Sequence, residues 1–142
     1  MDHVSLPVVV HQSIVYDGEV ERPVTGERLT GLGLRLDERD WAEVGRPVTV
    51  TGVVRWVRDD GQTSEAVVEC DGFSVLVTTP TGRPAPGAVG GTVRVRGHLT
   101  SIGPYEFDEF GLPDVTRDWI VRSVEVTAEP MLDFLVEIDP LD

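Results

Sequence analysis

The sequence predicts an all-β domain. Valine-rich stretches in which polar and apolar residues alternate dominate the chain from Gly45 to Ile102. Alternation with a period of two is the pattern of a strand that buries one face. The pair Asp71-Gly72 between two such stretches is a strong signal of a two-residue hairpin turn. The stretch Pro80–Gly91 carries three prolines and four glycines, a composition that does not sustain a helix.

Five core strands are expected, at Val48–Val57, Ala66–Cys70, Phe73–Thr79, Thr92–Ile102 and Trp119–Thr127. Gly52 interrupts the first strand and leaves two alternatives for it. Simple alternation faces Trp56 inward, whereas a one-residue bulge at Gly52 turns Trp56 and Arg58 to the outer face. In the fourth strand the pattern faces Val93, Val95, Gly97 and Leu99 inward and Arg94, Arg96, His98 and Thr100 outward.

Further alternating stretches flank these strands. Val4–Tyr16 and Leu32–Leu36 precede them, and we expect the two to pair with each other or to cover a barrel edge. Asp37–Val44 is the best candidate for a short helix, and residues 132–138 predict a further strand or an extended tail. The chain is interpreted as one domain, 1–142, with an N-terminal strand extension (1–44), a core (45–128) and an acidic, hydrophobic C-terminal segment (129–142).

The order of the core strands resembles the oligonucleotide/oligosaccharide-binding (OB) fold, a five-stranded, partly open barrel. The helix that this family commonly has between its third and fourth strands is replaced here by the Pro/Gly-rich connector. The resemblance implies that single-stranded nucleic acid binds across the second and third strands on cations and aromatic rings. The candidate residues for this are Arg55, Trp56, Arg58, Phe73, Arg94, Arg96 and His98. Alternatively, the arginines pair with Glu65, Glu69 and other acids across the strands.

The charge distribution favours a protein partner. The net charge is −13; residues 1–44 hold 9 acids and 4 arginines, residues 45–102 hold 5 and 6, and residues 103–142 hold 11 and 2. Neutralisation of phosphates supplies most non-specific affinity for nucleic acid, so the acidic flanks disfavour that partner. Acidic surfaces speed association with cationic proteins. The candidates for protein contact are Tyr105, Phe107, Asp108, Glu109, Phe110, Phe134, Asp139 and Leu141.

Motifs for catalysis or metal binding are missing from the sequence. His3, His11 and His98 are scattered, and the acidic loop 106–114 lacks the spacing of an EF-hand. We therefore expect no enzymatic activity, no metal and no cofactor. The single cysteine, Cys70, excludes an intrachain disulfide and is predicted to pack as a small apolar residue.

The composition also suggests where the protein works. No basic-then-apolar leader and no apolar run of about 20 residues is present, so we expect a cytoplasmic protein without a membrane partner. Arginine, valine, glycine and proline are plentiful while lysine and asparagine are missing, as in GC-rich bacterial genomes.

Three functions fit these observations. The first is a non-catalytic module that binds a protein partner, with a basic protein as the candidate, as an acidic adaptor, accessory or immunity-type protein. The alternative is a single-stranded nucleic-acid-binding protein, and a weaker alternative is a small-ligand or sugar site in the barrel mouth. The fold alone does not decide among them.

Overall fold

Strands make up most of the chain. The computed structural model of the protein describes residues 5–18, 20–37, 46–59, 63–79, 86–103, 107, 111–126 and 133–141. Within these ranges the elements are β1 (Leu6–Val10), α1 (Gln12–Tyr16), β2 (Arg28–Asp37), β3 (Pro47–Asp59), β4 (Ser64–Glu69), β5 (Ser74–Thr79), β6 (Thr92–Ile102), β7 (Arg117–Val126) and β8 (Phe134–Pro140).

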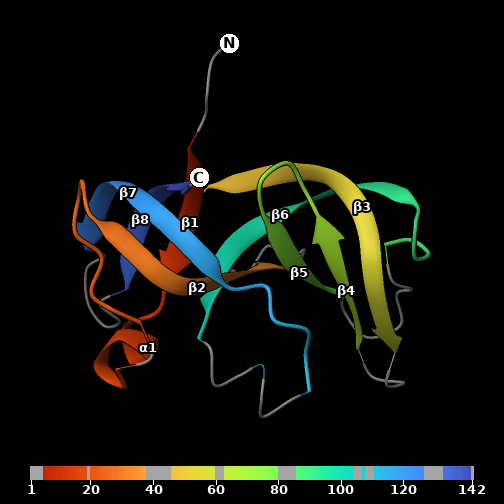
Figure 1. Cartoon of the computed structure of the whole chain (residues 1–142), viewed down its shortest axis with the longest axis horizontal. Coiled ribbons are helices and arrows are strands. Elements are labelled where there is room, and N and C mark those ends of the chain that lie inside the picture. The colour runs from red at the N-terminus through yellow and green to blue at the C-terminus, as the bar shows by residue number, and fades with distance from the viewer. Residues whose placement is uncertain are drawn as a thin grey trace.

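These strands close into a barrel in the order β1-β6-β3-β4-β5-β2-β7-β8. The prediction of an all-β barrel is confirmed, although the ring contains three more strands than expected. An additional pairing joins β2 to β6 across the ring, with residues 33–37 antiparallel to residues 98–102. This pairing divides the ring into two five-stranded loops that share β2 and β6, seen side by side in Figure 1.

The strand that closes the predicted core is β2 and not the stretch Trp119–Thr127. β2 pairs in parallel with β5 through residues 35–37 and antiparallel with β6, and it completes the loop β3-β4-β5-β2-β6. The predicted fifth strand corresponds to β7, which lies in the other loop, β1-β6-β2-β7-β8. β2 takes the central place because Leu32, Leu34 and Leu36 are all fully buried. A strand that buries such a row of leucines belongs inside the structure and not on an edge.

The two N-terminal stretches do not pair with each other, so that alternative is wrong, whereas the other alternative, covering a barrel edge, holds for β2, which pairs along β5. β1 lies between β6 and β8, and β2 lies between β5 and β7. The first stretch was expected to stay extended to Tyr16, but it turns into α1 after His11. The backbone N–H of Gln12, at the start of α1, donates to the carboxylate of Asp133 at 3.1 Å. Such a side-chain acceptor stabilises a helix start where strand pairing has ended.

Two further predictions concern the C-terminal strand and the short helix before β3. The strand predicted at residues 132–138 is present from Phe134 onward as β8, which lies antiparallel between β1 and β7; residue 132 lies outside the described residues. The helix expected at Asp37–Val44 lies outside the described residues, apart from Asp37 at the end of β2. No described helix has the length and apolar character that a membrane span requires.

The pairing of β3 passes from β6 to β4 at Val53, next to Gly52. A Cβ atom at position 52 would lie 2.2 Å from the carbonyl oxygen of Glu69, so the approach of β4 requires a glycine there. The bulge lies three residues further on, because Val54 pairs with Val68 and Trp56 pairs with Val67. The alternative that turns Trp56 outward is therefore correct, but its predicted position at Gly52 is wrong.

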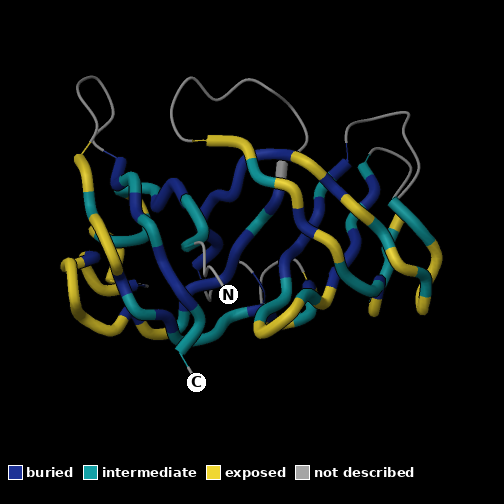
Figure 2. The backbone as a smooth tube through the Cα atoms, turned by 90° about the horizontal axis from the view of Figure 1, so that it is seen from above, coloured by how far each residue is buried: buried dark blue, intermediate teal, exposed yellow. Residues whose placement is uncertain are grey.

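Two clusters of apolar side chains hold the barrel together. The larger one is internal and continues through both loops, with Val10, Leu36, Val54, Leu99 and Trp119 among its buried members. The smaller one lies on the outer face of β4, β5 and β6, and consists of Val67, Leu76, Ile102, Phe107, Leu112 and Val115 with Trp56 against it. Figure 2 shows buried residues through the strands and exposed residues in the turns and at intervals along the strands.

The predicted facing of β6 holds for its first half. Val95 and Leu99 are buried, whereas Arg94 and Arg96 are exposed. His98 and Thr100 were expected to face solvent, but they are only 7 and 8 % exposed. From His98 onward β2 lies along β6, and β1 pairs with residues 99 and 100 from the other side. The second half of β6 is consequently a central strand, paired along its edges, and every residue from 97 to 102 is buried.

Candidate interaction site

Exposed arginines gather on the outer face of β3 and β6. Arg94 lies opposite Thr51 and Arg96 opposite Thr49 in the antiparallel pairing, and Arg55 follows on the same side of β3. The guanidinium of Arg55 forms an ion pair with Glu69, with Nε 3.4 Å from Oε2. The structure thus places two of the predicted nucleic-acid contacts, Arg94 and Arg96, next to each other, and the third, Arg55, pairs with an acid on β4.

The other predicted nucleic-acid contacts are engaged inside the protein. Arg58 pairs with Glu65 at 2.9 Å and lies 5.5 Å from the centre of the Trp56 ring. Trp56 packs against the outer cluster, and the ring of Phe73 packs against Trp119 with centroids 5.9 Å apart. His98 is buried. These aromatic side chains therefore do not form an open platform on which bases could stack.

The outer face of β4 and β5 is covered by the protein's own chain. These strands correspond to the second and third strands of the predicted core, the face on which OB domains receive single strands. Phe107, Leu112 and Val115 lie over Val67 and Leu76 there and complete the outer cluster. The fit is close, since a Cβ atom on Gly33 of β2 would lie 2.9 Å from the tip of the Phe107 ring.

Several residues predicted to contact a protein are buried instead. Phe107 belongs to the outer cluster and Phe134 to the internal one, with 6 and 4 % of their surfaces exposed. Asp139 is 5 % exposed, and its Oδ2 accepts a hydrogen bond from Nε of Arg122 at 2.6 Å. Leu141 is partly exposed, and its carbonyl accepts from Arg117. Tyr105, Asp108, Glu109 and Phe110 lie outside the described residues.

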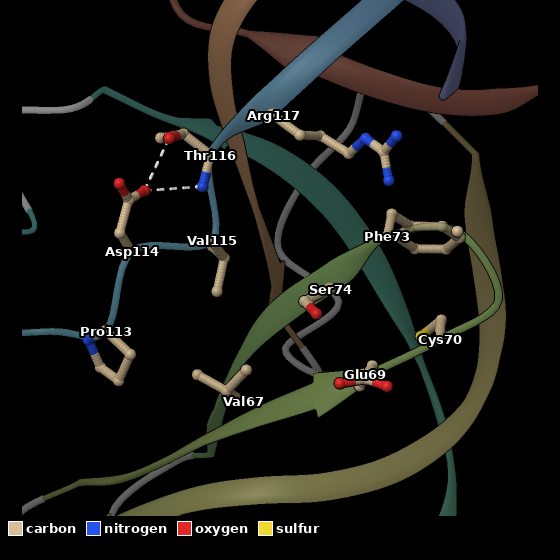
Figure 3. A pocket seen from close by; sticks show the side chains of 11 residues that line it. Val67, Glu69, Cys70, Phe73, Ser74, Pro113, Asp114, Val115, Thr116 and Arg117 are labelled. Carbon is tan, nitrogen blue, oxygen red and sulfur yellow. Dashed lines mark hydrogen bonds between the residues drawn. The ribbon is translucent and has the colours of Figure 1, made fainter. Parts of the chain in front are cut away.

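A groove lies between the end of the β4–β5 hairpin and the extended segment that leads into β7 (Figure 3). We call it the hairpin groove; its volume is about 390 Å³. In Figure 3 the side chain of Val115 points toward that of Val67, with which it shares the outer cluster. The lining residues are Val67, Glu69, Cys70, Gly72, Phe73, Ser74, Pro113, Asp114, Val115, Thr116 and Arg117.

Local hydrogen bonds fix the wall formed by residues 113–117. Oδ1 of Asp114 accepts from the backbone N–H of Thr116 at 2.8 Å and from its hydroxyl at 2.6 Å. This turn, a common use of Asp followed by Thr, holds the segment in its extended course. Arg117 donates from Nη2 to the carbonyl of Leu141 at 2.8 Å and lies 5.6 Å from the Trp119 ring. The wall is thereby tied to the end of β8.

Cys70 lines the groove as a protonated thiol. Burial raises its pKa to about 11, and the negative charge of Glu69 contributes to the increase. The thiolate is the nucleophilic form of cysteine, so a thiol with this pKa is a poor nucleophile at neutral pH. The groups of the groove that can contact a ligand are consequently its carboxylates, its apolar floor and its backbone.

A histidine, a serine and a carboxylate lie together at the start of α1, but the serine hydroxyl contacts the main chain of the histidine and not its imidazole. The hydroxyl of Ser101 accepts from the backbone N–H of His11 at 3.0 Å, and the imidazole lies 3.7 Å from the carboxylate of Asp133. The serine thus contacts the main chain of His11, an arrangement that fastens α1 to β6 and to the start of β8. Within the described ranges, no three His, Cys, Asp or Glu side chains gather so as to hold a metal ion.

A second groove, of about 410 Å³, lies where β1, β7 and β8 meet. Arg46 and Glu137 form an ion pair at its rim. The groove is lined by Pro7, Val8, Arg46, Ser123, Val124, Glu125, Leu135, Val136 and Glu137.

Sequence reasoning missed most of the hairpin groove, including Asp114, Thr116 and Arg117. Phe73 was singled out as a ring for stacking, but its place in this groove was not foreseen. The local signals were the Asp71-Gly72 turn and the Asp114–Thr116 spacing, and neither shows that the two segments lie side by side.

Comparison of the chain with protein-family models, with characterised proteins and with solved structures finds no match.

Proposed function

We propose that this chain is a non-catalytic module that binds a basic protein partner, as an adaptor, accessory or immunity-type protein of the cytoplasm. One observation carries the proposal: Phe107, Leu112 and Val115 occupy the outer face of β4 and β5, where an OB domain would receive a single strand. A net charge of −13 further disfavours a polyanion and supports a cationic partner.

Single-stranded nucleic acid is the second candidate, favoured by one specific feature. Arg94 and Arg96 are exposed on neighbouring outward positions of β6, and Arg55 is exposed further along β3, four residues beyond Thr51, the partner of Arg94. Exposed cations on one face are typical of surfaces that bind a phosphate backbone. The ion pair between Arg55 and Glu69 reduces their combined charge, which is why this function ranks second.

A pull-down from the native host, treated or untreated with nuclease, tests the first proposal. We expect the wild-type protein to capture a basic protein in both samples. Capture should weaken as salt is raised from about 50 to 500 mM, because screening shortens the reach of surface charges. The double variant Arg94→Ala/Arg96→Ala serves as the control and should capture the same protein. Loss of capture on nuclease treatment, or in this variant, would contradict the proposal.

A further inference from the structure

We propose that the hairpin groove binds an extended, positively charged segment of the partner, which adds a short strand beside β5. This inference rests on the proposed function and assigns the surface through which it is carried out. The groove differs from the arginine face of β3 and β6, and it contains none of the residues first expected to contact a protein.

The backbone of Ser74 provides the pairing edge. In an antiparallel ladder, hydrogen-bonded and non-hydrogen-bonded pairs alternate. The N–H of Cys70 donates to the carbonyl of Phe73 at 2.8 Å, so the next pair, Glu69 with Ser74, is non-hydrogen-bonded. The N–H and C=O of Ser74 therefore point away from β4 and toward the next strand position of the sheet.

That strand position is filled along only part of β5. β2 pairs with β5 from Leu76 to Thr78, and the register of the described residues places no strand beside Ser74. The extended wall at residues 113–117 faces this end of β5 across the groove. An extended peptide that enters the groove can pair with the edge of β5, as in other proteins that bind peptides by strand addition.

The floor and rim of the groove indicate the kind of segment that fits. Val67, Phe73 and Val115 provide apolar surface for one side chain of the guest. Glu69 and Asp114 are exposed, lie on opposite walls and place a carboxylate on each side. Glu69 also forms an exposed ion pair with Arg55, at 3.4 Å, for which a cation of the guest competes. Because alternate side chains of a strand point to opposite faces, apolar residues that alternate with Lys or Arg match this surface. Arg117 is turned toward the chain end by its bond to Leu141.

A labelled pentapeptide, Lys-Val-Lys-Val-Lys with a neutral fluorophore, is the probe. Five extended residues span about 17 Å. Binding to the full-length protein is measured by fluorescence anisotropy at about 50 mM salt, where surface charges are weakly screened. We expect saturable binding that weakens as salt is raised. The analogue Gln-Val-Gln-Val-Gln should bind at least about tenfold more weakly, since it lacks the charges that pair with Glu69 and Asp114.

Two variants locate the site. Ser74→Pro removes the N–H that points away from β4 and should abolish binding without disturbing the β4–β5 ladder, since proline is tolerated at unpaired strand positions. Glu69→Gln/Asp114→Asn should weaken binding by about tenfold, because it removes both rim charges. The matched control Glu21→Gln/Glu27→Gln removes two exposed carboxylates from the segment that precedes β2 and should bind as wild type does.

The outcomes separate this inference from the proposed function. Equal weakening by the two double variants would show that only total charge matters, which overturns the groove but leaves a basic partner in place. If the peptide does not bind but the pull-down captures a basic protein, the groove is not the binding site, while the proposed function stands. Groove-dependent peptide binding supports the inference. If Ser74→Pro is unfolded by circular dichroism, the double variants decide.

Discussion

Leu99→Ala is expected to lower the free energy of unfolding by about 2–5 kcal/mol, the range for a fully buried leucine. Leu99 is 1 % exposed and belongs to the internal cluster. It lies opposite Leu36 of β2 and beside Val8 of β1, so it contributes to both loops of the barrel. The cavity left by the substitution would therefore open at the pairing that divides the ring.

The matched control for this prediction is Arg94→Ala on the exposed face of the same strand. Its effect should be about 1 kcal/mol or less, as for exposed charged side chains. Urea denaturation of the two variants gives both values from shifts in the midpoint. Equal losses at the two sites would show that the facing of β6 described here is incorrect.

Gly52→Ala should destabilise the protein by about 3 kcal/mol, the upper part of the range for overpacking. The added Cβ would lie 2.2 Å from the carbonyl oxygen of Glu69 and 2.9 Å from a methyl group of Val68. The first of these is a backbone atom, so relief requires that β3 and β4 move apart. The substitution thus acts on the strand pairing and not merely on a side-chain rotamer.

Thr51→Ala tests whether this effect belongs to the glycine. Thr51 is the exposed neighbour of Gly52 on β3, and its substitution should change the midpoint of urea denaturation by little, as at most surface sites. A Gly52→Ala protein whose stability lies within about 0.5 kcal/mol of wild type would contradict the close approach of β4 to β3 at this point.

The sequence predicts most strands of this barrel but not how they pair. Strands are visible because alternation is local, as in Thr92–Ile102, whose range coincides with β6. The place of β2 is not visible, because Leu32, Leu34 and Leu36 present the same local pattern at an edge or in the centre. Its pairing with β5 and β6 is set by contacts distant in sequence.

The candidate site was harder to predict for the same reason. The ion pairs Arg55–Glu69 and Arg58–Glu65 were foreseen as an alternative, since β3 and β4 follow each other in the sequence and acids recur on β4. The burial of Phe107 and Phe134 was not foreseen, because an aromatic residue in an acidic segment looks the same whether it serves a core or a partner. The hairpin groove depends on where Pro113–Arg117 crosses the barrel, which no local motif reveals.

The covered outer face of β4 and β5 predicts that the protein does not bind single-stranded nucleic acid there. If the protein does not accept single strands, labelled single-stranded DNA or RNA should show no binding by fluorescence anisotropy at about 50 mM salt, where electrostatic affinity is strong. Deleting the acidic C-terminal segment is unsuitable as a comparison, because it removes β8 and with it Phe134, Val136 and Ile138 of the internal cluster. The full-length chain and the double variant Arg94→Ala/Arg96→Ala are the samples to compare.

This titration is the most direct test of a protein-binding module against a nucleic-acid-binding one. We predict that neither protein binds the oligonucleotides. Micromolar or tighter binding by the wild type, lost in the double variant, would contradict the account. Affinity would then fall with salt by about 0.7 logarithmic units per logarithmic unit of salt for each phosphate neutralised. That result would assign the function to the arginines of β3 and β6.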